Sequence, residues 1–300
     1  MDRITELAST IDRHVGGAGI CTTTMPRVSL IRADQPSTPT PAVYEASLCL
    51  IAQGSKQVSI GDHSVTYDAA HYLLVSVDLP LVGHVIDASP GRPYLCCKID
   101  LDIAALADLM TAEGNGEAAS RDDLPVLGVY PGDPDLIDAA CRLIGLLDRP
   151  ETIATLQPLI EREILYRLLT GPHGPMLRRM ATAGSRLNQV SRAIAAIRRR
   201  FNAPIRIDEV AAEAGMSPSS LYAHFKAITR MTPLEYQKQL RLQEARRLMM
   251  AGGATAGTAS FAVGYESPSQ FSREYRRLFG APPRQDIERL HAVPSAGMPL

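Results

Sequence analysis

The sequence has only five cysteines and no long apolar run, and each of these features argues against a class of protein. A membrane-spanning helix needs ~20 predominantly apolar residues, but the best candidate stretch, residues 69–86, is broken by His71, Asp78 and Pro80. The cysteines include no CxxC pair, which indicates neither a disulfide framework nor a zinc ribbon, and we expect no metal site. The first ten residues lack the apolar core of a secretory signal, so we expect a cytoplasmic protein with reduced cysteines.

Charge is divided unevenly along the 300 residues, a length that is enough for about two domains. Residues 1–177 hold 12 Lys and Arg against 23 Asp and Glu, a net charge of −11. Residues 178–300 hold 19 against 9, a net charge of +10. A basic half joined to an acidic half predicts that only the second half meets a polyanion, although chance segregation of solvated charges stays open on charge alone.

Short apolar runs separated by turn residues fill the chain from residue 21 to about residue 100 and predict a β-rich domain. A short helix over residues 1–14 precedes them, and the Pro-rich residues 36–41 are expected to form an extended arm. The predicted strands are 44–52, 56–60, 64–67, 72–77, 81–86 and 94–99. Several short strands at such close spacing are typical of a small barrel or sandwich.

Helical periodicity begins after residue 100, where apolar residues recur at spacings of three and four. The predicted helices are 101–112, 134–147 and 151–169. The last helix carries a stripe that serves either as core or as a partner-binding face, formed by Leu156, Leu159, Ile160, Ile164 and Leu168. Gly- and Pro-containing segments at 171–175 and 183–185 flank a linker, so the predicted domains are residues 1–180 and 185–292.

One pattern occurs twice in the basic half, fifty residues apart. The first copy, DEVAAEAGMSPSSLYAHF at 208–225, returns as TASFAVGYESPSQFSREY at 258–275. In each copy a glycine, Gly215 or Gly264, ends one helix, and a Ser-Pro pair caps and begins the next. These are the parts of a helix-turn-helix, and two copies in register indicate a DNA-binding unit rather than a purely structural repeat.

A helix predicted over residues 233–250 connects the two copies. Eighteen helical residues span about 27 Å. One DNA turn is about 34 Å, so a rigid connector of this length places two recognition helices within reach of successive major grooves on one duplex face.

The outward face of each second helix supplies the candidate DNA contacts. Arg273 is the first choice for reading guanine and Gln270 for adenine, because these side chains make bidentate contacts with those bases. For Arg273, the alternatives are a phosphate contact or a surface salt bridge to Glu266 or Glu274. The full base-reading set is Ser219, Ser220, Ala223, Ser269, Gln270 and Arg273. The predicted phosphate contacts are Ser217, Lys226, Arg230, Ser267, Arg276 and Arg277, while residues 198–200 either join them or are solvated.

Residues 186–290 resemble the DNA-binding domain of the AraC/XylS family of bacterial transcription regulators. The most specific part is GYESPSQFSREY at 264–275, followed by Phe279-Gly280 and Pro282-Pro283. Arg230 departs from the pattern, because it stands where the family often has glycine. Residues 44–102 are similar to the cupin-like N-terminal domain of one subgroup. The resemblance implies an α+β protein in which a cupin-like β-barrel with accessory helices precedes an all-α domain with two helix-turn-helix motifs.

The resemblance also implies a sequence-specific transcriptional regulator that binds double-stranded DNA at an operator or promoter. The N-terminal domain is then expected to sense a small molecule or to dimerise. The apolar stripe, and not the resemblance, makes the helices of 134–169 the expected dimer contact. RNA polymerase, a small-molecule effector and a second copy of the chain are the candidate partners. No catalytic residue, cofactor or membrane partner is expected.

Two alternatives stay open. One is a barrel-domain enzyme fused to a DNA-targeting domain, with His63, His71 and His84 as the histidines a metal would use. That segment has no HxH pair, and the chain has no GxSxG motif or P-loop. The other is an architectural DNA-binding protein without an effector.

Overall fold

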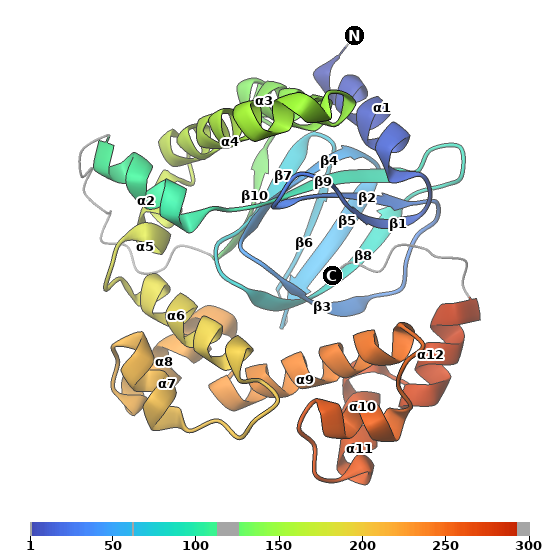
Figure 1. Ribbon diagram of the computed structural model, residues 1–300, viewed down its shortest axis with the longest axis vertical. Helices are drawn as coiled ribbons and strands as arrows, with labels where there is room; N and C mark the ends of the chain where they lie inside the picture. The colour runs from blue at the N-terminus through green and yellow to red at the C-terminus, as the bar shows by residue number, and fades with distance from the viewer. Residues whose placement is uncertain (1, 62, 113–125, 293–300) are drawn as a thin grey trace.

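The computed structural model describes residues 2–61, 63–112 and 126–292. Two β-sheets and their covering helices form the N-terminal part, and a layer of helices below them forms the C-terminal part (Figure 1). The predicted α+β fold is therefore confirmed. Within the described residues, no helix is both long and apolar enough to cross a membrane.

Among the described residues the strands form two antiparallel sheets and not the single closed barrel that the resemblance implies. In spatial order, the larger sheet contains β1 (Gly19–Thr22), β2 (Val28–Ala33), β9 (Tyr94–Asp100), β4 (Ser47–Gln53), β7 (His71–Val75) and β10 (Leu127–Pro131). The smaller sheet contains β3 (Thr40–Tyr44), β8 (Leu79–Asp87), β5 (Ser55–Ile60) and β6 (His63–Asp68). Side chains of both sheets join one apolar core between them.

Three differences separate the predicted strands from the observed ones. The run 44–52 is two strands, because β3 ends at Tyr44 and β4 starts at Ser47. The expected Pro-rich arm contributes the start of β3, and Pro41 is tolerated there because β3 lies at the edge of its sheet. The sequence patterns do not predict β1, β2 or β10, of which β1 and β10 are short and partly exposed.

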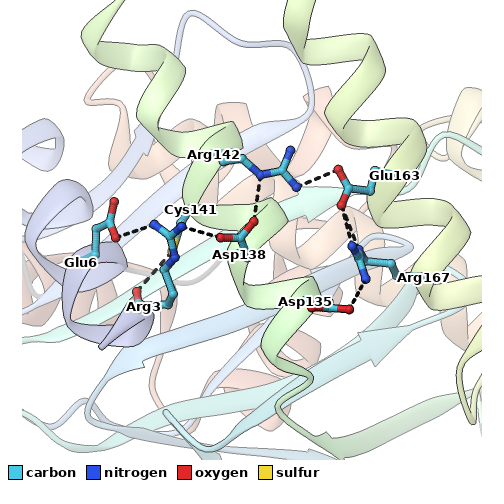
Figure 2. Close-up of polar contacts among 8 residues, drawn as sticks. All are labelled: Arg3, Glu6, Asp135, Asp138, Cys141, Arg142, Glu163 and Arg167. Carbon is cyan, nitrogen blue, oxygen red and sulfur yellow. Dashed lines mark hydrogen bonds and ion pairs between the residues drawn. The ribbon is translucent and has the colours of Figure 1, made fainter. Parts of the chain in front are cut away.

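In the described residues of the N-terminal part the α-helices are α1 (Arg3–Val15), α2 (Ile103–Ala112), α3 (Pro134–Gly145), α4 (Ile153–Thr170) and α5 (Gly174–Ala181). A chain of ion pairs joins α1, α3 and α4 (Figure 2). The Asp138 carboxylate of α3 forms ion pairs with Arg3 at 2.7 Å and with Arg142 at 2.9 Å. Arg142 also pairs with Glu163 of α4 at 2.7 Å. Because the charges form a connected network, they hold the three helices in one layer more firmly than isolated surface pairs would.

The apolar stripe of α4 divides between two environments. Ile160, Ile164 and Leu168 are buried in the core, whereas Leu156 and Leu159 face outward with exposures of 39% and 62%. The stripe is therefore part core and part exposed face.

The C-terminal part consists of α6 (Arg186–Arg199), α7 (Ile207–Ala214), α8 (Pro218–Thr229), α9 (Pro233–Met250), α10 (Ala256–Ala262), α11 (Pro268–Phe279) and α12 (Pro283–Ala292). The apolar core of the N-terminal part continues through α6, α7 and α8 as far as Tyr236 of α9. A separate core lies around the second helix pair and includes Phe271 and Tyr275. The first helix-turn-helix thus shares a continuous core with the N-terminal part, and the second has a core of its own.

Candidate nucleic-acid interface

The first helix-turn-helix is formed by α7, a tight turn and α8. Gly215 ends α7 with a positive φ of 69°, a conformation that glycine adopts at little cost. Ser217 caps α8 by accepting a hydrogen bond from the backbone N–H of Ser220 at 3.2 Å. Leu221 and Phe225 of α8 are fully buried, so the opposite side of the helix faces solvent.

The second helix-turn-helix repeats this arrangement with α10 and α11. Gly264 has a φ of 88°, and a Cβ atom at this position would overlap the backbone carbonyl of Asn202. Glycine is therefore required here for two independent reasons. Ser267 caps α11 by accepting from the backbone N–H of Gln270 at 3.3 Å, and Phe271 and Tyr275 are fully buried.

The connector α9 runs from Pro233 to Met250, with the boundaries that the sequence predicts. A capping box begins it, in which Thr232 and Glu235 satisfy each other's backbone N–H groups. Arg241 donates to the Gly264 carbonyl at 2.8 Å, which joins the connector to the second turn. The buried ion pair of Arg246 with Asp286, at 2.9 Å, joins it to α12. These contacts fix α11 relative to α9.

The structure places the predicted base-reading residues on the solvent-facing sides of α8 and α11. Ser219 and Ala223 of α8 are exposed and Ser220 is half-buried. Ser269, Gln270 and Arg273 of α11 are all exposed. Sequence reasoning missed Tyr222, which lies beside Ala223 with an exposure of 37%.

Five of the predicted DNA contacts are cations with no partner of their own. They are Lys226, Arg230, Arg273, Arg276 and Arg277, and in the described part of the chain none of them makes an ion pair or a side-chain hydrogen bond. The alternative of a salt bridge from Arg273 to Glu266 or Glu274 is thus not what the structure shows. Arginines of the connector α9 are paired instead, as Arg247 is with Glu244 at 2.7 Å.

Arg230 ends α8 in the left-handed conformation with a φ of 62°. The turn therefore keeps its left-handed conformation, although Arg230 stands where the family often has glycine. The strain of a left-handed arginine is small beside that of a β-branched residue, and the Arg230 side chain is exposed.

Gln270 makes a hydrogen bond within α11 that the predicted base-reading role does not include. Its side-chain amide donates to Glu274 at 3.3 Å, one helical turn further along α11. Glu274 also accepts from the Tyr265 hydroxyl at 2.8 Å and pairs with Lys238 of α9 at 3.2 Å. The i,i+4 spacing of Gln270 and Glu274 is the signal that would have found this contact.

Residues 198–200 all make ion pairs within the chain. Arg199 and Arg200 both pair with Glu213 of α7. Arg198 instead reaches the sheets, where it pairs with Glu45 and Asp78. The partners of Arg198 are far away in sequence, so no local pattern indicates them.

A cavity of about 490 Å³ opens where the sheets meet α9, and the sequence does not predict it. Ile31 of β2, Ala42 of β3 and Lys98 of β9 line it from the N-terminal part. Arg198 and Leu240 line it from the helical part. Its volume suits a small ligand.

Comparison with known proteins identifies the class. A family model described as the AraC-type transcriptional regulator N-terminus matches residues 24–176, and a helix-turn-helix domain model matches residues 210–289. The chain belongs to the family of AraC-type transcriptional regulators.

Among individual relatives, the HTH-type transcriptional regulator ArgR of Pseudomonas aeruginosa is 26% identical over 144 residues, which are 48% of this chain and 44% of ArgR. The HTH-type transcriptional activator RhaS of Shigella dysenteriae is 26% identical over 219 residues, which are 72% of each chain. Apo ToxT from Vibrio cholerae has the same fold, with a TM-score of 0.60 and 11% identity over 89% of this chain and 99% of ToxT. ToxT with an unsaturated fatty acid bound gives a TM-score of 0.57 and 13% identity over 89% and 96%.

Proposed function

We propose that this AraC-type regulator binds specific sites in double-stranded DNA through α8 and α11 and is controlled by a small molecule bound to its N-terminal part. One observation carries the proposal most directly. Five unpaired cations gather on the two helices that the turn chemistry identifies as recognition helices, while neighbouring arginines are neutralised by carboxylates. Unpaired cations are available to replace the counterions of DNA phosphates.

Within this proposal, residues 185–292 are the DNA-binding domain and residues 1–180 the sensor. Arg273, Gln270 and Ser269 of α11 read bases, and Ser219, Ser220 and Ala223 of α8 read thymine methyl groups or backbone shape with less discrimination. Lys226, Arg230, Arg276 and Arg277 contact phosphates. Ser217 and Ser267 remain phosphate candidates through their exposed turns, although their hydroxyls already cap helices.

Two observations support control by a small molecule. The cavity of about 490 Å³ lies between the sheets and α9, where an occupant touches both parts of the chain. ToxT, which shares the fold, has been solved with an unsaturated fatty acid and with a naphthalenyl butenoic acid. We also propose a cytoplasmic location, a homodimer through the outer face of α4, and RNA polymerase as a partner when DNA is bound. No catalytic activity is proposed, because the named relatives are transcriptional regulators.

Selection of duplexes from a random pool tests the DNA-binding proposal. Two recurrent half-motifs about one helical turn apart are expected, because α8 and α11 address successive major grooves. A variant carrying both Arg273→Ala and Gln270→Ala is the matched comparison, and it is expected to lose preference in one half-motif only. If the duplexes selected by the unmodified protein share no sequence preference, an architectural DNA-binding protein is favoured. Stoichiometric metal together with substrate turnover would favour the enzyme alternative.

A further inference from the structure

Polar side chains that the DNA-binding proposal does not use lie buried between the two sheets. Lys56 of β5 is 3% exposed, and strand alternation turns it inward with Val58 and Ile60. Tyr67 of β6 stands directly opposite Lys56 in the strand register. Tyr44 of β3 approaches from the other side, with its ring centre 5.0 Å from the Lys56 Nζ atom.

Gly83 of β8 makes room for this arrangement. A Cβ atom there would overlap the Tyr44 hydroxyl oxygen and lie 3.2 Å from the Lys56 Cε atom. The side chains of Tyr44 and Lys56 thus meet next to Gly83, which has no side chain of its own. The alternation of the neighbouring strands would otherwise fill this position with an apolar group.

Lys56 has no carboxylate partner in the described part of the chain. An unpaired ammonium group in a dry interior is costly, so it must be neutral or must be compensated by a nearby negative charge. Lys98 differs, because Asp100 lies 2.7 Å from its Nζ atom.

Three tyrosine hydroxyls share the same interior without a hydrogen-bond partner among the described residues. They belong to Tyr44, Tyr67 and Tyr94, which are each 3% exposed or less. Burial raises the pKa of Tyr67 and Tyr94 well above the ordinary value, so both hydroxyls stay protonated. Buried polar groups are nearly always satisfied, so several unsatisfied ones in one place need an explanation. One ammonium and three hydroxyls together offer donors that lack an acceptor.

The chain itself offers one competing acceptor. Cys49 of β4 contacts Cys96 of β9, and this contact together with the positive charges of Lys56 and Lys98 lowers the pKa of the Cys49 thiol. A Cys49 thiolate would compensate Lys56 from within. The Cys49 sulfur would then be the single acceptor offered to the hydroxyls of Tyr67 and Tyr94.

An entrance lies next to the cluster. Ala42 lines the cavity between the sheets and α9, and Tyr44 is the next inward-facing residue of β3. Lys98 lines the same cavity, and Cys96 is the next residue on that face of β9. The polar cluster therefore forms the next layer inward from the cavity floor.

We propose that the space between the sheets binds a small organic monocarboxylate, whose carboxylate accepts hydrogen bonds from Lys56, Tyr44 and Tyr67. The body of the molecule extends past Ala42 into the cavity against Leu240. This inference rests on the proposed control by a small molecule and names the chemical class of that effector. A carboxylate fits because it is acceptor-only and carries the charge that Lys56 lacks.

Thermal unfolding of the full chain with sodium formate, acetate and benzoate tests the site, with sodium chloride at equal ionic strength and benzamide as controls. At a tenfold excess over Kd, a carboxylate that binds only the folded chain is expected to raise Tm by about 3–6 °C. Benzamide is expected to leave Tm unchanged. The absence of a saturable rise with all three carboxylates would overturn the proposal.

Lys56→Met keeps the length of the side chain and removes its charge, and Lys226→Met on α8 is the matched control. The Lys56 variant is expected to fold with a Tm at least equal to that of the parent in chloride and to lose the carboxylate response. The Lys226 variant should keep that response. An equal rise in both variants would place the anion elsewhere. Should Lys56→Met fail to fold, Tyr67→Phe removes one hydroxyl only and is expected to weaken carboxylate binding about threefold to tenfold.

Cys49→Ser separates the external carboxylate from the internal thiolate. If a carboxylate compensates Lys56, this variant keeps its rise in Tm. If the thiolate does so, the variant loses stability in chloride and the parent shows no carboxylate response, which contradicts the proposal.

DNA binding is measured separately, so that failure of one proposal is not taken for failure of the other. The carboxylate that raises Tm is expected to change the affinity of the parent for its selected duplex at least threefold and to leave Lys56→Met unaffected. A rise in Tm without any change in DNA affinity would retain the site and refute its role as the effector site. A chain without sequence-specific DNA binding would overturn the proposed function while Tm still reports on the site.

Discussion

Arg198 of α6 donates a hydrogen bond to the Glu45 carboxylate at 2.7 Å, and this contact crosses from the helical part to the sheets. The same guanidinium pairs with Asp78, whose backbone carbonyl accepts the Tyr236 hydroxyl of α9 at 3.2 Å. The ion pairs keep the pKa of Arg198 raised although burial opposes this, and they keep the pKa of Glu45 lowered. Glu45 also lines the cavity between the two parts, so an occupant there meets the contact that joins them.

Arg198→Ala is expected to lower the free energy of unfolding by about 1–2 kcal/mol, because it leaves Glu45 and Asp78 without their shared partner. Arg199→Ala is the matched control, since Arg199 is 63% exposed and pairs only within the helical part, with Glu213. Its effect should stay within about 0.5 kcal/mol. Urea unfolding followed by circular dichroism measures both. If both variants lower the free energy of unfolding equally, the contact between the two parts contributes no more than the pair within the helical part.

Arg273→Ala is expected to relax sequence preference at one base position and to leave the others unchanged. A bidentate contact from arginine to guanine contributes about 1–3 kcal/mol of discrimination, and Arg273 is exposed without an internal partner. Binding to a set of duplexes that differ at single positions measures the effect. Full discrimination by the variant at every position would remove Arg273 from the base-reading set.

Arg277→Ala is expected to weaken binding to all duplexes about equally, because phosphate contacts carry no sequence information. The slope of log K against log salt should fall in magnitude by about 0.9, because the variant neutralises one phosphate fewer than the parent. Affinities for a specific and a random duplex at salt concentrations from about 50 to about 200 mM would show this. A change confined to the specific duplex would reassign Arg277 to base reading.

The outer face of α4 is expected to hold two chains together. Leu159 and Tyr166 lie two turns apart there, with exposures of 62% and 42%. Glutamate at both positions should convert a dimer to a monomer in analytical ultracentrifugation, because it places charge in an apolar contact. Leu234→Glu, at a residue of α9 that is 47% exposed, is the control. A dimer that survives the double substitution would locate the interface elsewhere.

Local signals in the sequence predict the helical half in detail. The capping serines, the turn glycines and the Ser-Pro starts are read within one helical turn, so α8, α9 and α11 begin where the sequence predicts. Many strands depend on partners that are distant in the chain. For this reason one predicted run is two strands, since β3 pairs with β8 and β4 with β9, and the sequence does not predict β2, which also pairs with β9. The same reason hides the partners of Arg198, because Asp78 and Glu45 lie 120 and 153 residues away.

The sequence indicates that Lys56 is buried, but it does not indicate which residues surround it. Lys56 shares its strand face with Val58 and Ile60, and that alternation places a lysine in the core. Its tyrosine neighbours come from β3, β6 and β9 across two sheets, so no local pattern indicates them. A sequence thus indicates that a polar residue is buried, and only the fold shows which groups it meets.

His173 makes the stability of the N-terminal part dependent on pH. It is 3% exposed, its Nδ1 atom lies 3.1 Å from the Tyr72 hydroxyl, and burial lowers its pKa from 6.5 to about 4. Between these two pH values the unfolded chain binds a proton at this residue and the folded chain does not. The free energy of unfolding therefore falls as the pH drops from 6.5 towards 4, with a slope of at most about 1.4 kcal/mol per pH unit from this residue.

His173→Phe is expected to flatten that slope, because phenylalanine fills the ring site beside Tyr72 and Tyr130 without binding a proton. His63→Phe is the control, since His63 is exposed. Urea unfolding at intervals from about pH 4 to about pH 7.5 measures the slope for the parent and both variants. Removing the hydrogen bond to Tyr72 lowers stability by a similar amount at every pH, so it shifts the curve without changing its slope. Parallel curves for parent and His173→Phe would show that His173 does not control the acid response.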